Sequence, residues 1–87
     1  MKHAGRTALD TLEPMLERLR ELDGIGERKR GIFYRKSQAF LHFHEDEAGL
    51  FCDVRLDGNA DFERFPVTTS GQQQDVLKRV VQALRQV

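Results

Sequence analysis

The spacing of apolar residues changes twice along the chain, and this change constrains the fold more than any other feature of the sequence. Near the start, apolar side chains recur at the spacing of one helix face, at Leu9, Leu12, Met15, Leu16, Leu19 and Leu22. The same spacing returns near the end, at Val76, Leu77, Val80, Val81 and Leu84. The apolar runs between these segments are too short for helices. The sequence therefore predicts two amphipathic helices around a set of strands.

Proline and glycine indicate the limits of the first helix. Pro14 has no backbone N–H and fits best in a first helical turn, so we expect the helix to begin near Asp10 or Thr11. Gly24 supplies a left-handed residue that ends it. Residues 1–8 show no periodicity, and we expect a flexible N-terminal end there.

Short runs rich in aromatic or β-branched residues predict four strands, at residues 31–35, 38–45, 50–56 and 62–67. Residues 57–61 have the composition of a turn. Pro66 places the last strand at an edge of the sheet, because proline cannot donate a hydrogen bond to a central ladder. Ser70 and Gln73 have the spacing of a capping box, which begins the second helix.

The order of helix, four strands and helix predicts an α+β fold. A two-layer sandwich, with a four-stranded antiparallel meander and both helices on one face, buries the apolar side of every element. Residues 9–87 then form a single domain with one modest core. The order resembles that of frataxin-like domains and of small bacterial families of unknown function with the same layout, and the resemblance implies the fold alone. The acidic first helix typical of frataxins is not matched, because its charges alternate at Glu17, Arg18, Arg20 and Glu21.

The pairing of the second and third strands decides which residues share a face, because a shift of one residue turns every side chain over. In one register Glu45 pairs with Leu50 across a four-residue loop, and His42 lies opposite Asp53. In the other register the loop is one residue shorter, and His42 lies on the same face as Cys52. We prefer the first register because it separates the apolar residues from the charged ones.

This register, extended through a two-residue turn at Lys36 and Ser37 that pairs Phe33 with Phe40, predicts a sheet face that the helices leave uncovered. Its side chains are Phe33, Arg35, Phe40, His42, His44, Phe51, Asp53, Arg55 and Arg64. Exposed phenylalanines need a covering partner, and aromatic and arginine side chains are enriched at interfaces. The first functional prediction is therefore a non-catalytic binding or interaction module, forming a homodimer or binding a partner protein. Its binding residues are Phe33, Arg35, Phe40, Phe51 and Arg55.

A second prediction is a divalent-metal site. His42 and His44 are alternate residues of one strand, so both imidazoles point to the same side. Asp53 supplies a third ligand in the preferred register, and Glu45 or Asp46 is the candidate for a fourth. The alternative is a solvated strand face on which a histidine pairs with Asp53. No other cofactor is predicted.

Catalysis is the weaker class of function for this sequence. His42 with Asp53 has the arrangement that orients a catalytic histidine, but a nucleophile is missing. Cys52 is expected in the core, and the residues before the second helix are explained by capping, with Ser70 among them. The sequence contains no glycine-rich phosphate loop and no nucleophile elbow.

A third prediction is weak binding of single-stranded nucleic acid through residues 28–36, which contain no acid. The cations of this stretch are Arg28, Lys29, Arg30, Arg35 and Lys36. Against it stand the acidic turn at residues 45–47 and the balanced charge, with 14 Lys and Arg to 14 Asp and Glu. The single cysteine and the lack of a signal or spanning segment predict a cytoplasmic location without membrane contact.

Overall fold

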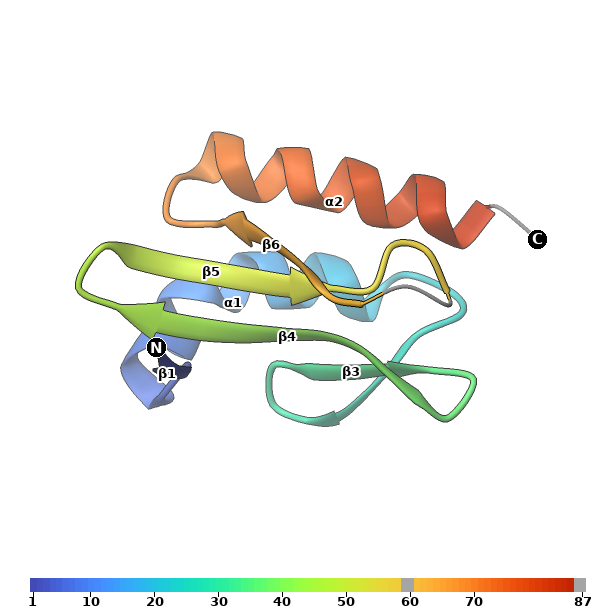
Figure 1. The fold of residues 1–87 in the computed structure, drawn as a ribbon, viewed down its shortest axis with the longest axis horizontal. Helices are drawn as coiled ribbons and strands as arrows, with labels where there is room; N and C mark the ends of the chain where they lie inside the picture. The colour runs from blue at the N-terminus through green and yellow to red at the C-terminus, as the bar shows by residue number, and fades with distance from the viewer. Residues whose placement is uncertain (59–60, 86–87) are drawn as a thin grey trace.

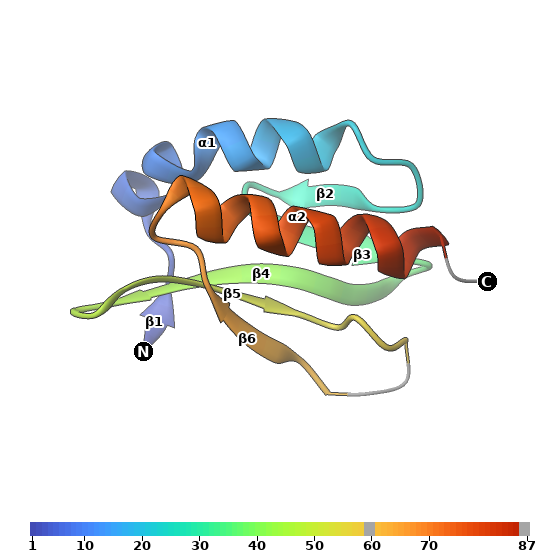
Figure 2. The same cartoon turned by 90° about the horizontal axis from the view of Figure 1, so that it is seen from above.

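The computed structural model describes residues 1–58 and 61–85, and there two helices cover one face of an antiparallel sheet. Figure 1 gives the arrangement, and Figure 2 shows both helices on the same side of β4 and β5. The elements are β1 (Lys2–His3), α1 (Arg6–Arg20), β2 (Gly26–Lys29), β3 (Ile32–Arg35), β4 (Gln38–Asp46), β5 (Gly49–Val54), β6 (Glu63–Pro66) and α2 (Ser70–Arg85). The predicted α+β sandwich with N- and C-terminal helices is confirmed. Within the described residues, neither helix has the length and apolarity to cross a bilayer.

The sheet runs in the order β2-β3-β4-β5-β6, and β1 pairs with β4. Figure 1 shows β1 and β3 along the same edge of β4, one toward each end. The four predicted strands correspond to β3 to β6, and Pro66 lies in an edge strand, as predicted. β1 and β2 are short additional strands. They carry no alternation of apolar and polar residues, and the predicted turn at 57–61 lies partly outside the described residues.

The predicted flexible end at residues 1–8 instead contains β1 and the start of α1. The Ala4 N–H donates to the Phe43 carbonyl at 3.0 Å. The Gly5 N–H donates to Glu45 Oε2 at 2.6 Å. This carboxylate stands at the N-terminus of α1, where the helix dipole favours negative charge. Long-range contacts with β4 therefore hold a segment that has no pattern of its own.

The first helix begins at Arg6 and not near Asp10, so Pro14 lies inside it on the exposed side. A proline inside a helix costs about 3 kcal/mol. Each fully buried leucine or methionine contributes about 1.5–3 kcal/mol, so the apolar stripe outweighs the proline. The buried residues of the stripe are Ala8, Leu12, Met15, Leu16 and Leu19. Gly24 is left-handed, with a φ of 98°, but it does not end the helix, because α1 already ends at Arg20 with Glu21 as its right-handed C-cap.

The capping box of α2 lies one residue before the predicted position. Thr69 Oγ1 accepts from the Gln72 N–H at 3.1 Å, and Gln72 Oε1 accepts from the Thr69 N–H at 3.1 Å. Ser70 is thus the first residue of the helix. Gln73, predicted to belong to the box, instead donates from Nε2 to the Val67 carbonyl at 3.0 Å.

β4 and β5 pair in the preferred register, with His42 opposite Asp53. The neighbouring residues point inward and are almost fully buried, at Leu41, Phe43, Cys52 and Val54. The ladder runs on to a pair between Asp46 and Gly49, so the loop has two residues where four were expected. The separation of apolar and charged residues predicted the register correctly.

The predicted pairing of β3 with β4 is correct next to the turn and wrong by one residue from Phe33 onward. Lys36 and Ser37 form the predicted two-residue turn, with φ values of 50° and 68°. A β-bulge then shifts the ladder, and Phe33 pairs with Leu41 instead of Phe40. Phe33 is 0% exposed and Phe40 is 3% exposed, and both belong to the core. The uncovered face therefore lacks two of its three expected phenylalanines.

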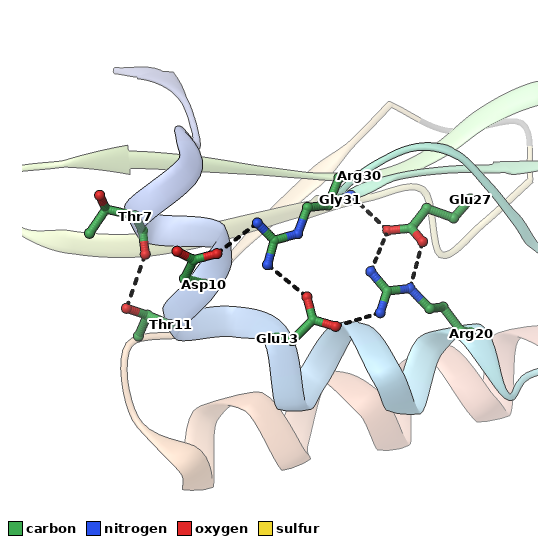
Figure 3. A network of polar contacts seen from close by, with 8 residues as sticks. All are labelled: Thr7, Asp10, Thr11, Glu13, Arg20, Glu27, Arg30 and Gly31. Atoms are coloured by element: carbon green, nitrogen blue, oxygen red, sulfur yellow. Dashed lines mark hydrogen bonds and ion pairs between the residues drawn. The ribbon is translucent and has the colours of Figure 1, made fainter.

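A network of ion pairs joins α1 to the hairpin of β2 and β3 (Figure 3). Arg30, in the turn of this hairpin, donates to Asp10 at 2.8 Å and to Glu13 at 2.8 Å. Arg20 donates to Glu13 at 2.5 Å and to Glu27 at 2.6 Å. A charged and mostly exposed strand is thus held by helix α1 rather than by apolar burial.

We expect Phe33→Ala to lower the free energy of unfolding by about 3–5 kcal/mol, because the truncation leaves a cavity in the core. Phe51→Ala, at a half-buried position of the outer face, is the control and is expected to lose about half of that or less. Urea unfolding of the three proteins measures the difference. A loss below about 1 kcal/mol for Phe33→Ala contradicts the shifted register.

Candidate functional site

Two histidines of β4 and an aspartate of β5 meet on the sheet face that the helices leave uncovered. His42 and His44 point outward because they alternate with core residues of the same strand. The register places Asp53 opposite His42. One ligand atom from each of the three lies within 4.8 Å of the others. The structure thus brings together the three residues that the sequence proposed as metal ligands.

A third histidine, His3, reaches this cluster from β1, where it pairs with His44. Its ring stacks on that of His44, with centroids 4.6 Å apart and an interplanar angle of 28°. The His3 and His42 ring centroids are 5.7 Å apart. His3 was not predicted as a ligand because residues 1–8 show no periodicity and a flexible end was expected there. Its residue type was the only indication of a role.

Asp53 is the charged centre of the cluster, and its side chain is 10% exposed. Arg64 on β6 donates from Nε to Oδ1 at 2.7 Å and from Nη2 to Oδ2 at 2.8 Å. Burial on its own favours the neutral acid, but Arg64 and the two imidazoles of β4 outweigh it and hold the pKa of Asp53 below its usual value. The carboxylate is therefore ionised at neutral pH.

The two imidazoles of β4 lie against the same oxygen. Nε2 of His42 is 3.5 Å from Asp53 Oδ2, and Nε2 of His44 is 3.3 Å from it. Burial lowers the pKa of His42 despite the nearby carboxylate, and the neighbouring imidazoles and Arg64 act in the same direction. His42 is consequently neutral at physiological pH, which is the protonation state that binds metal ions.

His44 Nδ1 is buried and, among the described residues, has no hydrogen-bond partner. Its other nitrogen, Nε2, lies 3.3 Å from Asp53 Oδ2. Buried polar atoms without a partner are rare in folded proteins. Because the two nitrogens of an imidazole point in different directions, a partner of Nδ1 would be separate from Asp53.

The other metal ligands considered from the sequence have different roles. Glu45 accepts from the Gly5 N–H and lies 4.0 Å from the Lys2 ammonium group. Asp46 Oδ1 accepts from the Ala48 N–H at 2.7 Å within the turn. Cys52 is 0% exposed on the inner face, and burial raises the pKa of its thiol. It cannot act as a ligand beside the histidines.

The predicted binding face keeps some of its residues at the surface. Phe51 is half-buried and lies opposite His44. The Arg55 guanidinium lies 4.2 Å from the ring centroid of Phe62, which in turn contacts the His42 ring edge to face at 4.8 Å. The Arg35 guanidinium lies 5.9 Å from the centroid of the buried Phe40 ring. Phe33 and Phe40 are corrected to core residues.

The basic stretch at 28–36 is less free than its sequence suggests. Arg30 is held by two carboxylates of α1, and the Arg28 guanidinium lies 4.3 Å from the ring centroid of Tyr34. Lys29 in β2 and Lys36 in the next turn are exposed. Residues 28–36 contain no acid, but in the folded chain Asp10 and Glu13 of α1 lie against Arg30.

The site combines imidazoles with an ionised carboxylate, the ligand types that bind zinc and neighbouring divalent metals. No protein-family model, curated protein or solved structure matches this chain. What the site can bind is therefore judged from its own geometry and charge.

We expect Asp53→Asn to lower the free energy of unfolding by about 1–2 kcal/mol at pH 7, because Arg64 then loses an ionised partner. The lowered pKa of Asp53 means that its contribution is full above the unfolded pKa of about 3.9 and disappears as the pH falls through the folded pKa. The difference between wild type and variant should therefore shrink below about pH 4.

Asp75→Asn is the matched control, because its pair with Arg79 is exposed, and we expect a change below about 0.5 kcal/mol. Thermal or urea unfolding at several pH values measures both differences. An Asp53→Asn protein as stable as wild type at pH 7 contradicts the charged role of Asp53.

Proposed function

We propose that this chain binds one divalent transition-metal ion through His42, His44 and Asp53. The observation that carries the proposal is that Nε2 of His42 and Nε2 of His44 lie 3.5 Å and 3.3 Å from the same oxygen of an ionised carboxylate. An ion between these three atoms would bind both imidazoles of β4 through Nε2. Nitrogen-rich ligand sets favour Zn²⁺, Co²⁺ and Ni²⁺ over Mg²⁺ and Ca²⁺.

Arg64 is the competitor of the metal in this proposal. Its guanidinium neutralises Asp53 in the metal-free protein, and its positive charge opposes a cation nearby. Its side chain is 47% exposed and stands on edge strand β6, so it has room to leave the carboxylate for water. We propose that Arg64 keeps the empty site stable and lowers its affinity for metal.

The proposed role is binding and not catalysis. The candidate nucleophile, Cys52, faces the core, and Thr69 and its neighbours cap α2. The interaction module and the nucleic-acid binder remain predictions, the first supported by the half-buried Phe51 and the second by the exposed Lys29 and Lys36. A cytoplasmic location likewise remains a proposal, and the buried free thiol of Cys52 supports it.

Titration with Zn²⁺ tests the metal proposal, and we expect one ion per chain. His42→Ala and His44→Ala should each weaken Zn²⁺ binding by more than about 100-fold. Loss of an outer-shell partner costs up to about that factor, and loss of a direct ligand costs more. Calorimetry gives the affinities, and the histidine ring signals in the NMR spectrum report the ligands. Co²⁺ serves as a second probe, because its visible absorption depends on coordination geometry.

Asp46→Asn is the control for this titration, since Asp46 is a nearby carboxylate that accepts a hydrogen bond within its own turn. Its affinity for Zn²⁺ should equal that of wild type. A wild-type protein whose His42 and His44 ring signals do not change at stoichiometric Zn²⁺ contradicts the proposed function.

Arg64→Gln should tighten Zn²⁺ binding by about tenfold, because it removes a positive charge and frees Asp53 Oδ2. Arg79→Gln is the matched control, since Arg79 pairs with Asp75 on α2 and not with the site. Calorimetry measures both variants. Unchanged or weaker binding by Arg64→Gln shows that Arg64 does not compete with the metal.

A further inference from the structure

His3 stands where a third imidazole ligand would be needed. In the antiparallel pair of β1 and β4, His3 lies directly opposite His44, so both side chains project from the same face of the sheet. His42 projects from that face as well. The three rings form one group, with every ring in contact with the other two.

The spacing of the rings agrees with that of imidazoles around one ion. A zinc–nitrogen bond of about 2.0–2.1 Å, with about 1.1 Å from nitrogen to ring centroid, places two tetrahedral imidazole centroids about 5.2 Å apart. The observed distances are 4.6 Å for His3 and His44, 4.8 Å for His42 and His44, and 5.7 Å for His3 and His42. They lie on both sides of the expected value. Because the His3 and His44 rings are stacked at 28°, the His3 side chain must rotate to direct a nitrogen at the ion.

We infer that His3 is the third imidazole ligand of this ion, and that metal binding fastens the segment 2–5 onto β4. The inference rests on the proposed function. The ligand atoms of His42, His44 and Asp53 already lie within 4.8 Å of one another, and His3, whose ring stacks on His44, would join them after a side-chain rotation. Three imidazoles and one carboxylate would fill the four positions of tetrahedral Zn²⁺. Zinc is accordingly the metal that the completed site favours.

The segment that His3 belongs to is held by few contacts without the ion. β1 has two exposed residues. The Ala4 N–H donates to Phe43 and the Gly5 N–H donates to Glu45. Short exposed segments with few backbone hydrogen bonds open locally at small free-energy cost. An ion that bridges His3 and β4 must release one ligand before the segment opens, so binding and closure are coupled.

Zn²⁺ alone, added to the full chain, tests this coupling in wild type and in His3→Gln. We expect His3→Gln to bind Zn²⁺ about 10- to 100-fold more weakly than wild type. Because coupling is reciprocal, amide exchange at Ala4 and Gly5 should slow by the same factor when wild type is saturated with Zn²⁺. His3→Gln should show no such slowing. Lys2→Gln is the control, because Lys2 is the neighbour of His3 on β1 and should bind Zn²⁺ as wild type does.

His3 is exposed, so metal-free His3→Gln should unfold with wild-type stability, and urea unfolding checks this. Wild-type affinity in His3→Gln, with exchange at Ala4 unaffected by Zn²⁺, overturns the role of His3 and leaves the site of His42 and His44 standing. A wild-type protein that binds no Zn²⁺ overturns both. Weaker binding in the variant, with loss of the slowed exchange, supports the third ligand.

Discussion

The fold is organised around the pairing of β4 with β5. These strands lie at the centre of the sheet, and their register decides at once what is core and what is surface. Leu41 and Phe43 point toward the helices, whereas His42 and His44 point away. A slip of one residue would turn the charged side chains toward the helices and expose the apolar ones. The packing of the apolar side chains against the two helices therefore also fixes the position of the polar cluster.

The polar cluster is balanced by charge but not by hydrogen bonding. The ionised Asp53 is neutralised by Arg64, and burial keeps His42 uncharged, so the group tolerates its low exposure. Among the described residues, His44 Nδ1 remains the exception. The physical basis of the metal proposal is that Nε2 of His42 and Nε2 of His44 converge on one carboxylate oxygen.

Contacts between distant parts of the chain hold the two short strands that lack an apolar pattern. β2 is tied to α1 by the network of Arg20, Arg30 and their carboxylates (Figure 3). β1 is tied to β4 by backbone pairing and by Glu45. The first contact removes Arg30 from the basic surface expected of residues 28–36, and the second delivers His3 to the other histidines. Both change the functional interpretation of the chain.

The amino-acid sequence was sufficient to predict the two helices, the four longer strands and the register of β4 with β5, because helical and alternating periodicity with separation of apolar from charged residues leave one consistent solution. It was therefore also sufficient to predict that His42, His44 and Asp53 meet. Three features became evident only in the folded chain: the bulge that buries Phe33 and Phe40, the start of α1 before Pro14, and the position of His3. These features depend on contacts between residues far apart in the chain, and no local pattern of residues records such contacts.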